Sequence, residues 1–391
     1  MIKKFNRVLI CIDSLFRIIK NKVISKKSVK GKKILIVFQQ VFGDAIIISN
    51  ALNRYVNLYS SQEGYSLKVV ANPSIIKFMK ETLPIDPNLV FEEINFKDFV
   101  NNFRYYRMIV KKYEDVDTII VPGTSLSAEI FSCAINARRK VGLVRYTDIK
   151  HPLIMAVFAK YAYTEIVRPE KDLMMLQRHR LLLNYLGDLD YKSRLPRMLC
   201  IDNKENNKWK YCVVCPGASI MEKCWPIERY VDLIDYIVEN KNLDVYLCGG
   251  KGEEHFGNIV EKNVKTPTRI YNVIGKTDFK EWVSIIQGSE FVVGNDSATV
   301  HIAAASLKKA ICIAGVYDKY QFFPYKVDLL EEDEFLPITI CKDKECAWCR
   351  SIGYYCGYKN EECSKRIKDN KCALCIDDIH LKEVIDEINK L

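Results

Sequence analysis

The stretch Val292–His301 reads V-V-G-N-D-S-A-T-V-H and joins an apolar run to a small-residue segment through a short polar turn. This order predicts a strand, a tight turn and a helix that begins at Ala298. The first N–H groups of a helix have no intrahelical partner, and the helix dipole adds positive potential there. A diphosphate is a natural ligand of such a terminus. Asp296 and His301 lie five residues apart across the turn, so we expect both to face one ligand.

Three further loops follow predicted strands. Gly43-Asp44 follows the first, and a carboxylate there can accept a proton from a bound hydroxyl, although a helix cap has the same pattern. Cys215–Ser219 leads to Lys223, which either neutralises a departing phosphate or is an ordinary surface lysine. Gly249–Glu254 is a glycine-rich turn whose acid can hold ribose hydroxyls, but its spacing does not fit a dinucleotide fingerprint.

The elements that must position these loops alternate between strand and helix patterns. Strands are predicted at 34–39, 67–71, 118–121, 140–144, 211–215, 243–248, 291–293 and 310–314. Helices are predicted at 45–59, 74–81, 125–136, 172–186, 226–239, 252–262, 279–287, 298–307 and 380–391. The polar segment 188–208 between the two halves reads as a linker. The pattern predicts an α/β protein with two Rossmann-like domains, 34–203 and 204–391, and an interdomain cleft lined by the carboxyl ends of the strands.

The net charge of +10 is concentrated in residues 1–33, which hold eleven Lys or Arg residues and one acid, Asp13. Apolar residues recur there at helical spacing, at positions 8, 12, 15, 16, 19 and 23. A basic amphipathic arm of this kind favours an anionic membrane surface, and the alternative is a helix packed on its own domain with a solvated basic face. A nucleic-acid partner is not expected, because the charge is not spread over a folded face.

Other compositional features narrow the class of protein. The arm does not resemble a secretory signal, because charges interrupt its apolar stretch and no small-residue cleavage site follows. We find no apolar run of 18 residues, so no membrane-spanning segment is expected. The chain has 15 cysteines, an odd number, and several of them fall in predicted strands. Free cysteines in core strands argue for a reducing compartment.

The four loops together resemble glycosyltransferase family 9, the heptosyltransferases of the lipopolysaccharide inner core. The matching pieces are I-L-I-V-F-Q-Q-V-F-G-D, P-G-A-S-I-M-E-K-C-W-P, L-C-G-G-K-G-E-E and V-G-N-D-S-A-T-V-H-I-A-A-A, within residues 34–320. The resemblance implies a GT-B fold with the acceptor in the first domain and the nucleotide sugar in the second. It implies inverting transfer that needs no metal, from a donor such as ADP-heptose to an acidic glycolipid, at the cytoplasmic face of the bacterial inner membrane.

The resemblance also implies roles for individual residues. Asp44 is the expected general base and Lys223 the expected partner of the diphosphate, with Ser219 beside it. Glu254, or less directly Glu253, is expected to hold the ribose. The remaining expected donor-binding residues follow the strand at 291–293: Asp296, Ser297, Ala298 and His301. Candidate partners of an acidic acceptor are Arg138, Arg139, Arg145, Arg178 and Arg180.

One residue departs from the family pattern, which has glycine where this chain has Ala298. If that position needs a positive φ, alanine costs about 1 kcal/mol and moves the backbone. A non-catalytic nucleotide- or glycan-binding relative is therefore one alternative to the transferase hypothesis. A second alternative, based on the two Rossmann-like units and a metal- or cluster-bearing tail, is a nucleotide-linked oxidoreductase, which the missing G-x-G-x-x-G after the first strand disfavours.

Seven cysteines crowd into the tail, residues 341–375, with the spacing C-x4-C-x2-C-x6-C-x6-C-x8-C-x2-C. The two C-x2-C pairs, Cys346/Cys349 and Cys372/Cys375, can supply four thiolates to a structural zinc ion, or to an iron–sulfur cluster. A redox-sensitive disulfide cluster and unliganded thiols are the alternatives. Such a metal would hold the tail together, and the transfer chemistry itself requires no cofactor.

Overall fold

The computed structural model describes residues 2–23, 32–60, 64–114, 116–144, 157–158, 160–170, 172–201, 210–316, 321–342 and 361–391. The chain divides into two compact units. The first unit comprises Met1–Lys80, Ile85–Lys171 and Gln177–Ser193, and the second comprises Glu81–Pro84, Asp172–Leu176 and Arg194–Leu391. The domain boundary at residues 203–204 stays a prediction.

The first unit is built on a six-stranded parallel sheet in the order β3-β2-β1-β4-β5-β6. The strands are β1 Lys32–Phe38, β2 Tyr65–Ala71, β3 Val90–Glu93, β4 Val116–Val121, β5 Ala137–Leu143 and β6 Glu165–Val167. The helices are α1 Ile2–Val23, α2 Phe42–Ser60, α3 Pro73–Thr82, α4 Phe96–Phe99, α5 Phe103–Lys112, α6 Leu126–Ala134 and α8 Met175–Leu186.

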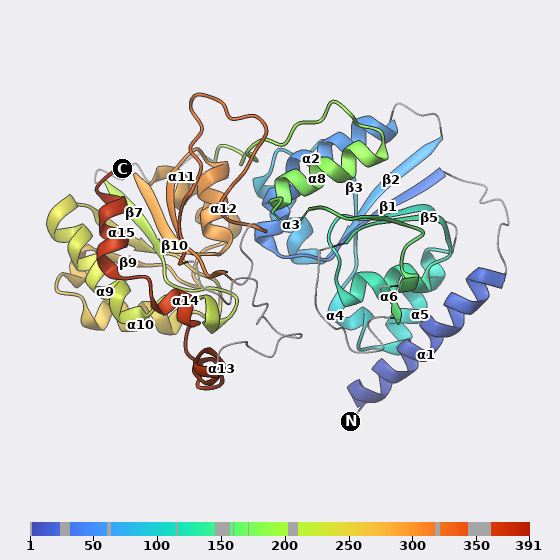
Figure 1. The fold of residues 1–391 in the computed structure, drawn as a ribbon, viewed down its shortest axis with the longest axis horizontal. Coiled ribbons are helices and arrows are strands. Elements are labelled where there is room, and N and C mark those ends of the chain that lie inside the picture. The colour runs from blue at the N-terminus through green and yellow to red at the C-terminus, as the bar shows by residue number, and fades with distance from the viewer. Residues whose placement is uncertain are drawn as a thin grey trace. The chain divides into compact units, whose positions relative to one another are not determined.

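Helices cover both faces of this sheet, with α2 and α8 on one side and α4, α5 and α6 on the other (Figure 1). The strands are therefore apolar on both faces, as parallel strands require. In β1, Leu35 and Val37 pack into the core cluster that α4, α5 and α6 help to form, and Ile34 and Ile36 are buried as well.

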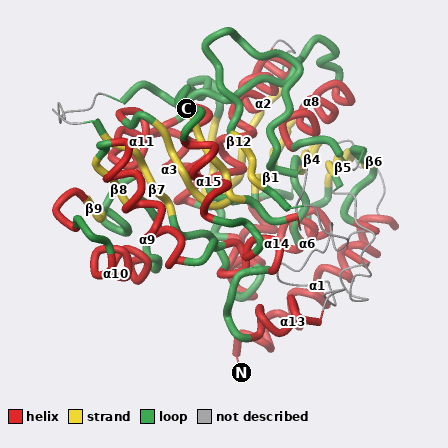
Figure 2. Tube along the Cα trace, turned by 60° about the vertical axis from the view of Figure 1, so that its left-hand side comes forward, coloured by secondary structure: helices red, strands yellow, loops and turns green. Residues whose placement is uncertain are grey.

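The second unit repeats this design with a parallel sheet in the order β12-β11-β10-β7-β8-β9. Its strands are β7 Tyr211–Cys215, β8 Asp244–Leu247, β9 Ile270–Asn272, β10 Phe291–Asn295, β11 Lys309–Ile313 and β12 Ile338–Ile340. Its α-helices are α9 Ile227–Tyr236, α10 Glu254–Asn263, α11 Phe279–Gly288, α12 Ala298–Ala305, α13 Glu361–Lys368, α14 Leu374–Asp377 and α15 Leu381–Ile388. A short 3₁₀ turn, η1, spans Met221–Lys223. Helices (red) and strands (yellow) alternate along the tube in Figure 2.

Both sheets are wound in the same way. In each, the first strand along the chain lies in the middle, the second and third extend one side, and the fourth to sixth extend the other. The direction of winding reverses between β1 and β4 and again between β7 and β10, and ligands of open α/β sheets bind at such switch points. The predicted α/β fold with two Rossmann-like sheets is confirmed.

Candidate donor and acceptor sites

A buried ion pair lies at the switch point of the second sheet. β7 and β10 are adjacent parallel strands, so the loops that follow them leave the same edge. Lys223 lies in η1 after β7, and Asp296 directly follows β10. The Lys223 Nζ donates to Asp296 Oδ2 at 2.9 Å, and both side chains are about nine-tenths buried. Two residues predicted to meet the donor are thus in direct contact.

Asn295, the last residue of β10, fixes the two loops beside this pair. Its Nδ2 donates to the carbonyls of Pro216 at 2.8 Å and Gly217 at 3.2 Å. Its Oδ1 accepts from the backbone N–H of Trp225 and from the Tyr230 hydroxyl, each at 3.0 Å. The side chain is fully buried, so each of these bonds forms in a low dielectric. The sequence placed Asn295 in a polar turn but gave no sign of this bracing role.

The N-terminus of α12 follows Asp296. Ser297 is the N-cap residue, in extended conformation, and its hydroxyl makes no capping hydrogen bond, while Cys215 Sγ lies 3.9 Å away. The first N–H groups of α12 therefore receive no acceptor from their own cap, and the terminus keeps its positive potential.

Ala298 is the first residue of α12 and has no positive φ. The described residues other than glycine with a positive φ are Asn242, Leu307 and Asn370. The concern that alanine strains this turn therefore does not apply, because a helical φ suits alanine. The argument for a non-catalytic relative loses its premise.

His301 is buried one turn into α12. Its Nδ1 lies 2.6 Å from the Tyr325 hydroxyl, and its ring stacks on Phe323 with centroids 4.9 Å apart. Burial lowers the pKa of His301 to about 4, so the imidazole is neutral at neutral pH. The expectation that His301 and Asp296 face one ligand stays a prediction.

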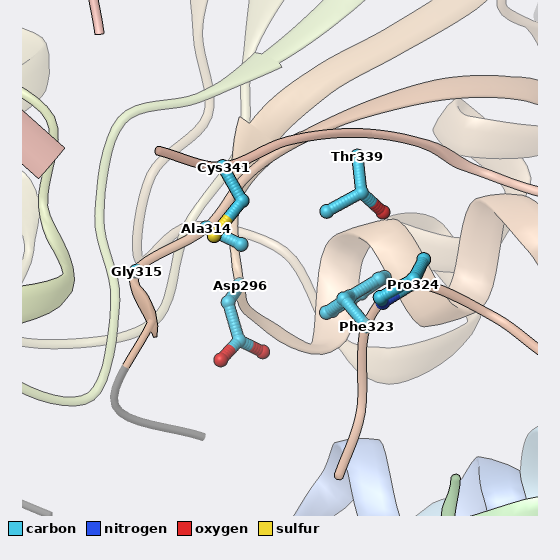
Figure 3. Close-up of a pocket in the computed structure, with 7 residues that line it drawn as sticks. All are labelled: Asp296, Ala314, Gly315, Phe323, Pro324, Thr339 and Cys341. Carbon is cyan, nitrogen blue, oxygen red and sulfur yellow. The ribbon is translucent and has the colours of Figure 1, made fainter. Parts of the chain in front are cut away.

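A pocket opens beside Asp296 (Figure 3). In this view Asp296 lies between Cys341 and Ala314 on one side and Phe323 and Pro324 on the other. Thr339 completes the lining, and its buried hydroxyl has no hydrogen-bond partner among the described residues. The pocket therefore combines a carboxylate, a free hydroxyl and an apolar ring face.

The two glutamates of the glycine-rich turn differ in their surroundings. The Glu253 carboxylate packs over Gly217 and Gly249, where an added Cβ would lie 2.5 Å from Glu253 Cδ and 2.8 Å from Glu253 Oε2 respectively. It accepts from the Gly250 N–H at 2.7 Å, and burial raises its pKa. Glu253 thus lies beside the loop after β7.

Glu254, the first residue of α10, is exposed and accepts from the Gly252 N–H at 2.7 Å. Ser219, in the bend after β7, is also exposed. Both side chains are open to solvent, as residues that await a ligand would be, but their roles stay predictions.

Asp44 lies at the corresponding switch point of the first sheet. It is in the first turn of α2, just after β1, and is largely buried. Its Oδ2 is 3.4 Å from the Val41 N–H, which is a long and weak hydrogen bond. Nearby, Gln40 Nε2 donates to the Gly123 carbonyl at 2.9 Å and so ties the loop after β1 to the loop after β4. The sequence did not reveal this contact.

The arginines proposed for an acidic acceptor fall into three groups. Arg138 pairs with Asp117 at 2.9 Å, and Arg139 pairs with Glu165 at 2.8 Å. Arg178 is buried and Arg180 half-buried on α8. Arg145 lies outside the described residues.

The structure describes two of the four cysteines that were predicted to bind a metal. Cys346 and Cys349 lie outside the described residues, whereas Cys372 and Cys375 are buried in the core of the second unit. Cys372 Sγ accepts from Arg366 Nη2 at 3.4 Å. Within the described part of the chain, no three His, Cys, Asp or Glu side chains gather as metal ligands.

Comparison with known proteins decides the family. The sequence pattern of glycosyltransferase family 9 (heptosyltransferase) matches residues 109–347. This chain belongs to glycosyltransferase family 9. The resemblance seen in the sequence is therefore confirmed, and membership favours a transferase over an oxidoreductase.

Two curated members of family 9 come from Haemophilus influenzae. Lipopolysaccharide core heptosyltransferase OpsX is 24% identical over 235 residues, which are 55% of this chain and 61% of OpsX. Lipooligosaccharide heptosyltransferase 2 is 25% identical over 224 residues, 54% of this chain and 63% of that protein. The chain thus matches about three-fifths of the length of these relatives.

Solved structures of glycosyltransferases share the fold of this chain. The family 9 glycosyltransferase of Veillonella parvula superposes with a TM-score of 0.64 at 15% identity, covering 92% of this chain and 96% of its own. Escherichia coli ADP-heptose lipopolysaccharide heptosyltransferase II gives 0.61 at 16% identity, with 92% and 98% covered. The iron-containing dodecameric glycosyltransferase TibC of E. coli gives 0.54 at 15% identity, with 92% and 76% covered.

Proposed function

We propose that this protein is an inverting glycosyltransferase that moves heptose from ADP-heptose to a lipopolysaccharide or lipooligosaccharide core, or to a related glycolipid. Family membership supports the reaction class. The names of OpsX and of heptosyltransferase II support the acceptor class and the donor.

The buried Lys223–Asp296 pair at the second switch point is the observation that carries the proposal. A nucleoside diphosphate leaves with growing negative charge, which a cation in a low dielectric stabilises strongly. Lys223 supplies that cation, and Asp296 holds its ammonium group in place at 2.9 Å. The uncapped N-terminus of α12, with Ser297 and Ala298, adds N–H donors for the phosphate oxygens.

The sugar and the ribose have their own candidate contacts. The sugar hydroxyls meet Asp296, near the pocket of Figure 3, and neutral His301 supports the wall of that pocket through Phe323. Ser219 and Glu254 bind the diphosphate and the ribose from the exposed loops after β7 and β8. Glu253 is the nearer acid to the loop after β7 and is the second candidate for the ribose.

Asp44 acts as the general base in this proposal. Its carboxylate takes the proton of the acceptor hydroxyl as that oxygen forms a bond to the anomeric carbon. The bond from that carbon to the diphosphate oxygen breaks on the opposite face, and its electron pair leaves with ADP. Configuration at the anomeric carbon is therefore inverted. A base of this kind contributes about 10²–10⁴-fold to the rate.

We further propose that transfer needs no metal, since Lys223 and the α12 N-terminus balance the charge of the leaving group. A structural zinc ion on Cys346, Cys349, Cys372 and Cys375 remains a separate proposal. Cys372 and Cys375 lie in one core, and Arg366 Nη2 donates to Cys372 Sγ, which favours a thiolate, whereas burial raises the pKa of that thiol.

The acceptor of this reaction would be an acidic glycolipid held at a membrane, so we place the enzyme on the cytoplasmic face of the inner membrane as a peripheral protein. No described helix is long and apolar enough to cross a bilayer. The amphipathic α1 is the proposed contact with anionic lipid.

Replacing Asp44 by Asn tests the proposal. With ADP-heptose and a core glycolipid lacking its next heptose, we expect Asp44→Asn to lose about 100-fold or more in turnover. ADP should still raise the melting temperature as in the wild type, because the donor site is intact. Asp98→Asn, an exposed carboxylate in the first turn of α4, is the matched control and should retain full turnover. Retained turnover in Asp44→Asn would remove Asp44 from its role, and failure of ADP to bind the wild type would refute the donor.

A further inference from the structure

Helix α1 has two apolar faces, and among the described residues only one of them packs against other elements. Its inner face packs on α5 and α6, with Ile10, Ser14 and Ile18 buried. The Ser14 hydroxyl lies 2.9 Å from the Tyr106 hydroxyl, which donates to Asp13 at 2.9 Å. Figure 1 shows α1 lying along the α5–α6 side of the first unit. The helix is therefore fixed to its unit and is not a loose tether.

The opposite face of α1 carries a second apolar row, which we call the outer stripe. Its spacing of three or four residues places all five side chains along one line of the helix. The residues and their exposed fractions are Phe5 63%, Val8 55%, Ile12 46%, Phe16 69% and Ile19 61%. Single exposed apolar residues are ordinary, but a continuous row with two phenylalanines marks a binding surface.

Charge around the outer stripe points to one kind of partner. Lys3, Lys4, Arg7 and Lys20 are exposed on α1. The only acid of the helix, Asp13, is already paired with Arg17 at 2.6 Å and with Arg107 at 3.2 Å. The neighbouring α5 has the sequence FRYYRMIVKK, with exposed basic residues and no acid. Asp98 is an exposed acid in the turn that contacts Asn6 and Arg7, but basic side chains outnumber acids around the row. An apolar row in a surround with this excess of cations fits an anionic lipid surface, where acyl chains receive the row and headgroups meet the cations.

We propose that the outer stripe of α1 inserts into an anionic bilayer surface and fixes the orientation of the first unit on the membrane. This inference rests on the proposed function for the identity of the membrane, and it names the contacting side chains. Because α1 is clamped through Asp13 and Tyr106, insertion of the stripe sets how the whole unit meets the lipid.

Cosedimentation of the full-length protein with vesicles tests the surface. We expect binding to vesicles of phosphatidylcholine with about a third phosphatidylglycerol, and at least tenfold weaker binding to phosphatidylcholine alone. Phe5→Ser with Phe16→Ser should weaken binding to the anionic vesicles by at least tenfold, since two exposed rings are lost. Leu189→Ser with Leu330→Ser removes two exposed apolar side chains elsewhere and is the matched control.

A fluorescence measurement separates insertion from simple charge attraction. Phe16→Trp should show a blue-shifted emission on addition of anionic vesicles and quenching by brominated acyl chains. Leu189→Trp, which is also highly exposed, should show neither change. Unchanged vesicle binding in the Phe5/Phe16 variant, or an unshifted emission from Phe16→Trp, overturns the proposal. A change from dimer to monomer in the Phe5/Phe16 variant, measured by light scattering without lipid, overturns it in favour of a second copy on the stripe.

Failure of the membrane-binding proposal can be distinguished from failure of the proposed transferase function. If the protein transfers heptose, the Phe5/Phe16 variant should keep its rate on a water-soluble core fragment and lose rate on a vesicle-embedded acceptor. If it transfers nothing, the vesicle-binding and fluorescence results still decide the surface.

Discussion

At the scale of single residues, the buried Lys223–Asp296 pair carries a desolvation cost. Desolvating two charges takes back most of what their attraction provides, so a buried pair is weak evidence of a stability role. Each partner nevertheless depends on the other, because a lone buried charge has no solvent to stabilise it. We infer that the pair is retained because it holds the Lys223 ammonium group in position before the donor binds.

Replacing Lys223 by Met should lower the free energy of unfolding by about 3–5 kcal/mol, since it leaves Asp296 buried and unpaired. The double variant Lys223→Met with Asp296→Asn should recover most of that loss, while neither variant should transfer sugar. Denaturant unfolding and the transfer assay measure the two effects. Lys210→Met breaks an exposed pair with Glu290 and should change stability by less than about 0.5 kcal/mol. Equal losses in the single and double variants would contradict the argument.

Acid should destabilise the protein through its buried histidines. Burial lowers the pKa of His301 to about 4 and that of His179 to about 3, whereas an unfolded histidine titrates near 6.5. The unfolded chain therefore binds more protons below pH 6.5, and stability is lost as pH falls from 6.5 towards 4. Between pH 7 and pH 5, His301→Gln should therefore lose less unfolding free energy than the wild type. The difference should grow by about 1.4 kcal/mol for each pH unit below the unfolded pKa.

Glu129 acts in the opposite direction over part of that window, so it serves as the control. Burial raises its pKa to about 7, and the folded state then binds the extra proton between pH 7 and 4.5. Glu129→Gln should therefore make the loss on acidification steeper, and His301→Gln should make it shallower. Parallel stability curves for the wild type and both variants would show that neither group carries the pH dependence.

At the scale of elements, the loops after β7 and β8 depend on one another. Glu253, from the second loop, occupies the space above Gly217 in the first, where any Cβ would displace its carboxylate. The glycines Gly217 and Gly249 of the two loops thus leave room for the Glu253 carboxylate.

Gly217→Ala should move Glu253 and weaken ADP binding about tenfold, the effect of losing one hydrogen bond to a charged group. Titration calorimetry with ADP measures this. Gly250→Ala is a matched control, because its Cβ would lie 3.7 Å from Glu253 Oε2, an ordinary contact. If Gly217→Ala binds ADP like the wild type, Glu253 has no part in the donor site.

The long elements could be read from the sequence, and the short edge strands could not. The predictions for 67–71, 211–215 and 279–287 lie within one or two residues of β2, β7 and α11. β3, β6, β9 and β12 were missed because they have three or four residues and mixed polarity, too few for a period to appear. Helix α5 was also missed, although Phe103, Tyr106 and Val110 follow helical spacing.

The place of a candidate site residue relative to a strand could be predicted from the sequence. Its hydrogen-bond partners from distant parts of the chain could not. Residues in the loop or first helical turn after a strand, such as Asp296 and Asp44, can be placed at a sheet edge from the pattern alone. The four hydrogen bonds of Asn295 and the approach of Tyr325 to His301 join segments 24 to 79 residues apart. No local sequence pattern specifies which distant residue becomes the hydrogen-bond partner.

At the scale of the whole molecule, the two units divide the proposed chemistry between them. The first carries the proposed base and the proposed membrane face, and the second carries the charges that we propose receive the diphosphate. The cysteines of the tail that the structure describes lie in or against the core of the second unit, with α15 packed on α9, β11 and β12. We therefore expect a metal bound by Cys372 and Cys375 to act on the stability of that unit.

Chelation should separate an effect of a metal on stability from an effect on transfer. Transfer measured in EDTA should proceed at the untreated rate, because the proposed charge stabilisation uses Lys223 and backbone N–H groups. Elemental analysis of protein purified without chelator should find about one zinc per chain, and Cys372→Ser with Cys375→Ser should abolish it. Cys133→Ser, a buried cysteine of the first unit, should leave the metal content unchanged. Iron in place of zinc would correct the metal, and loss of transfer in EDTA would refute metal independence.

The central position of the first strand in each sheet has a consequence for biosynthesis. Residues 39–115 lie between the end of β1 and the start of β4, and residues 216–290 lie between β7 and β10. At a ribosomal pace of about 5–20 residues per second, one side of β1 and later of β7 waits roughly 4–15 s for its neighbour. During each wait an apolar strand exposes bare backbone to other chains, so the nascent polypeptide should need chaperone protection twice, once for each sheet.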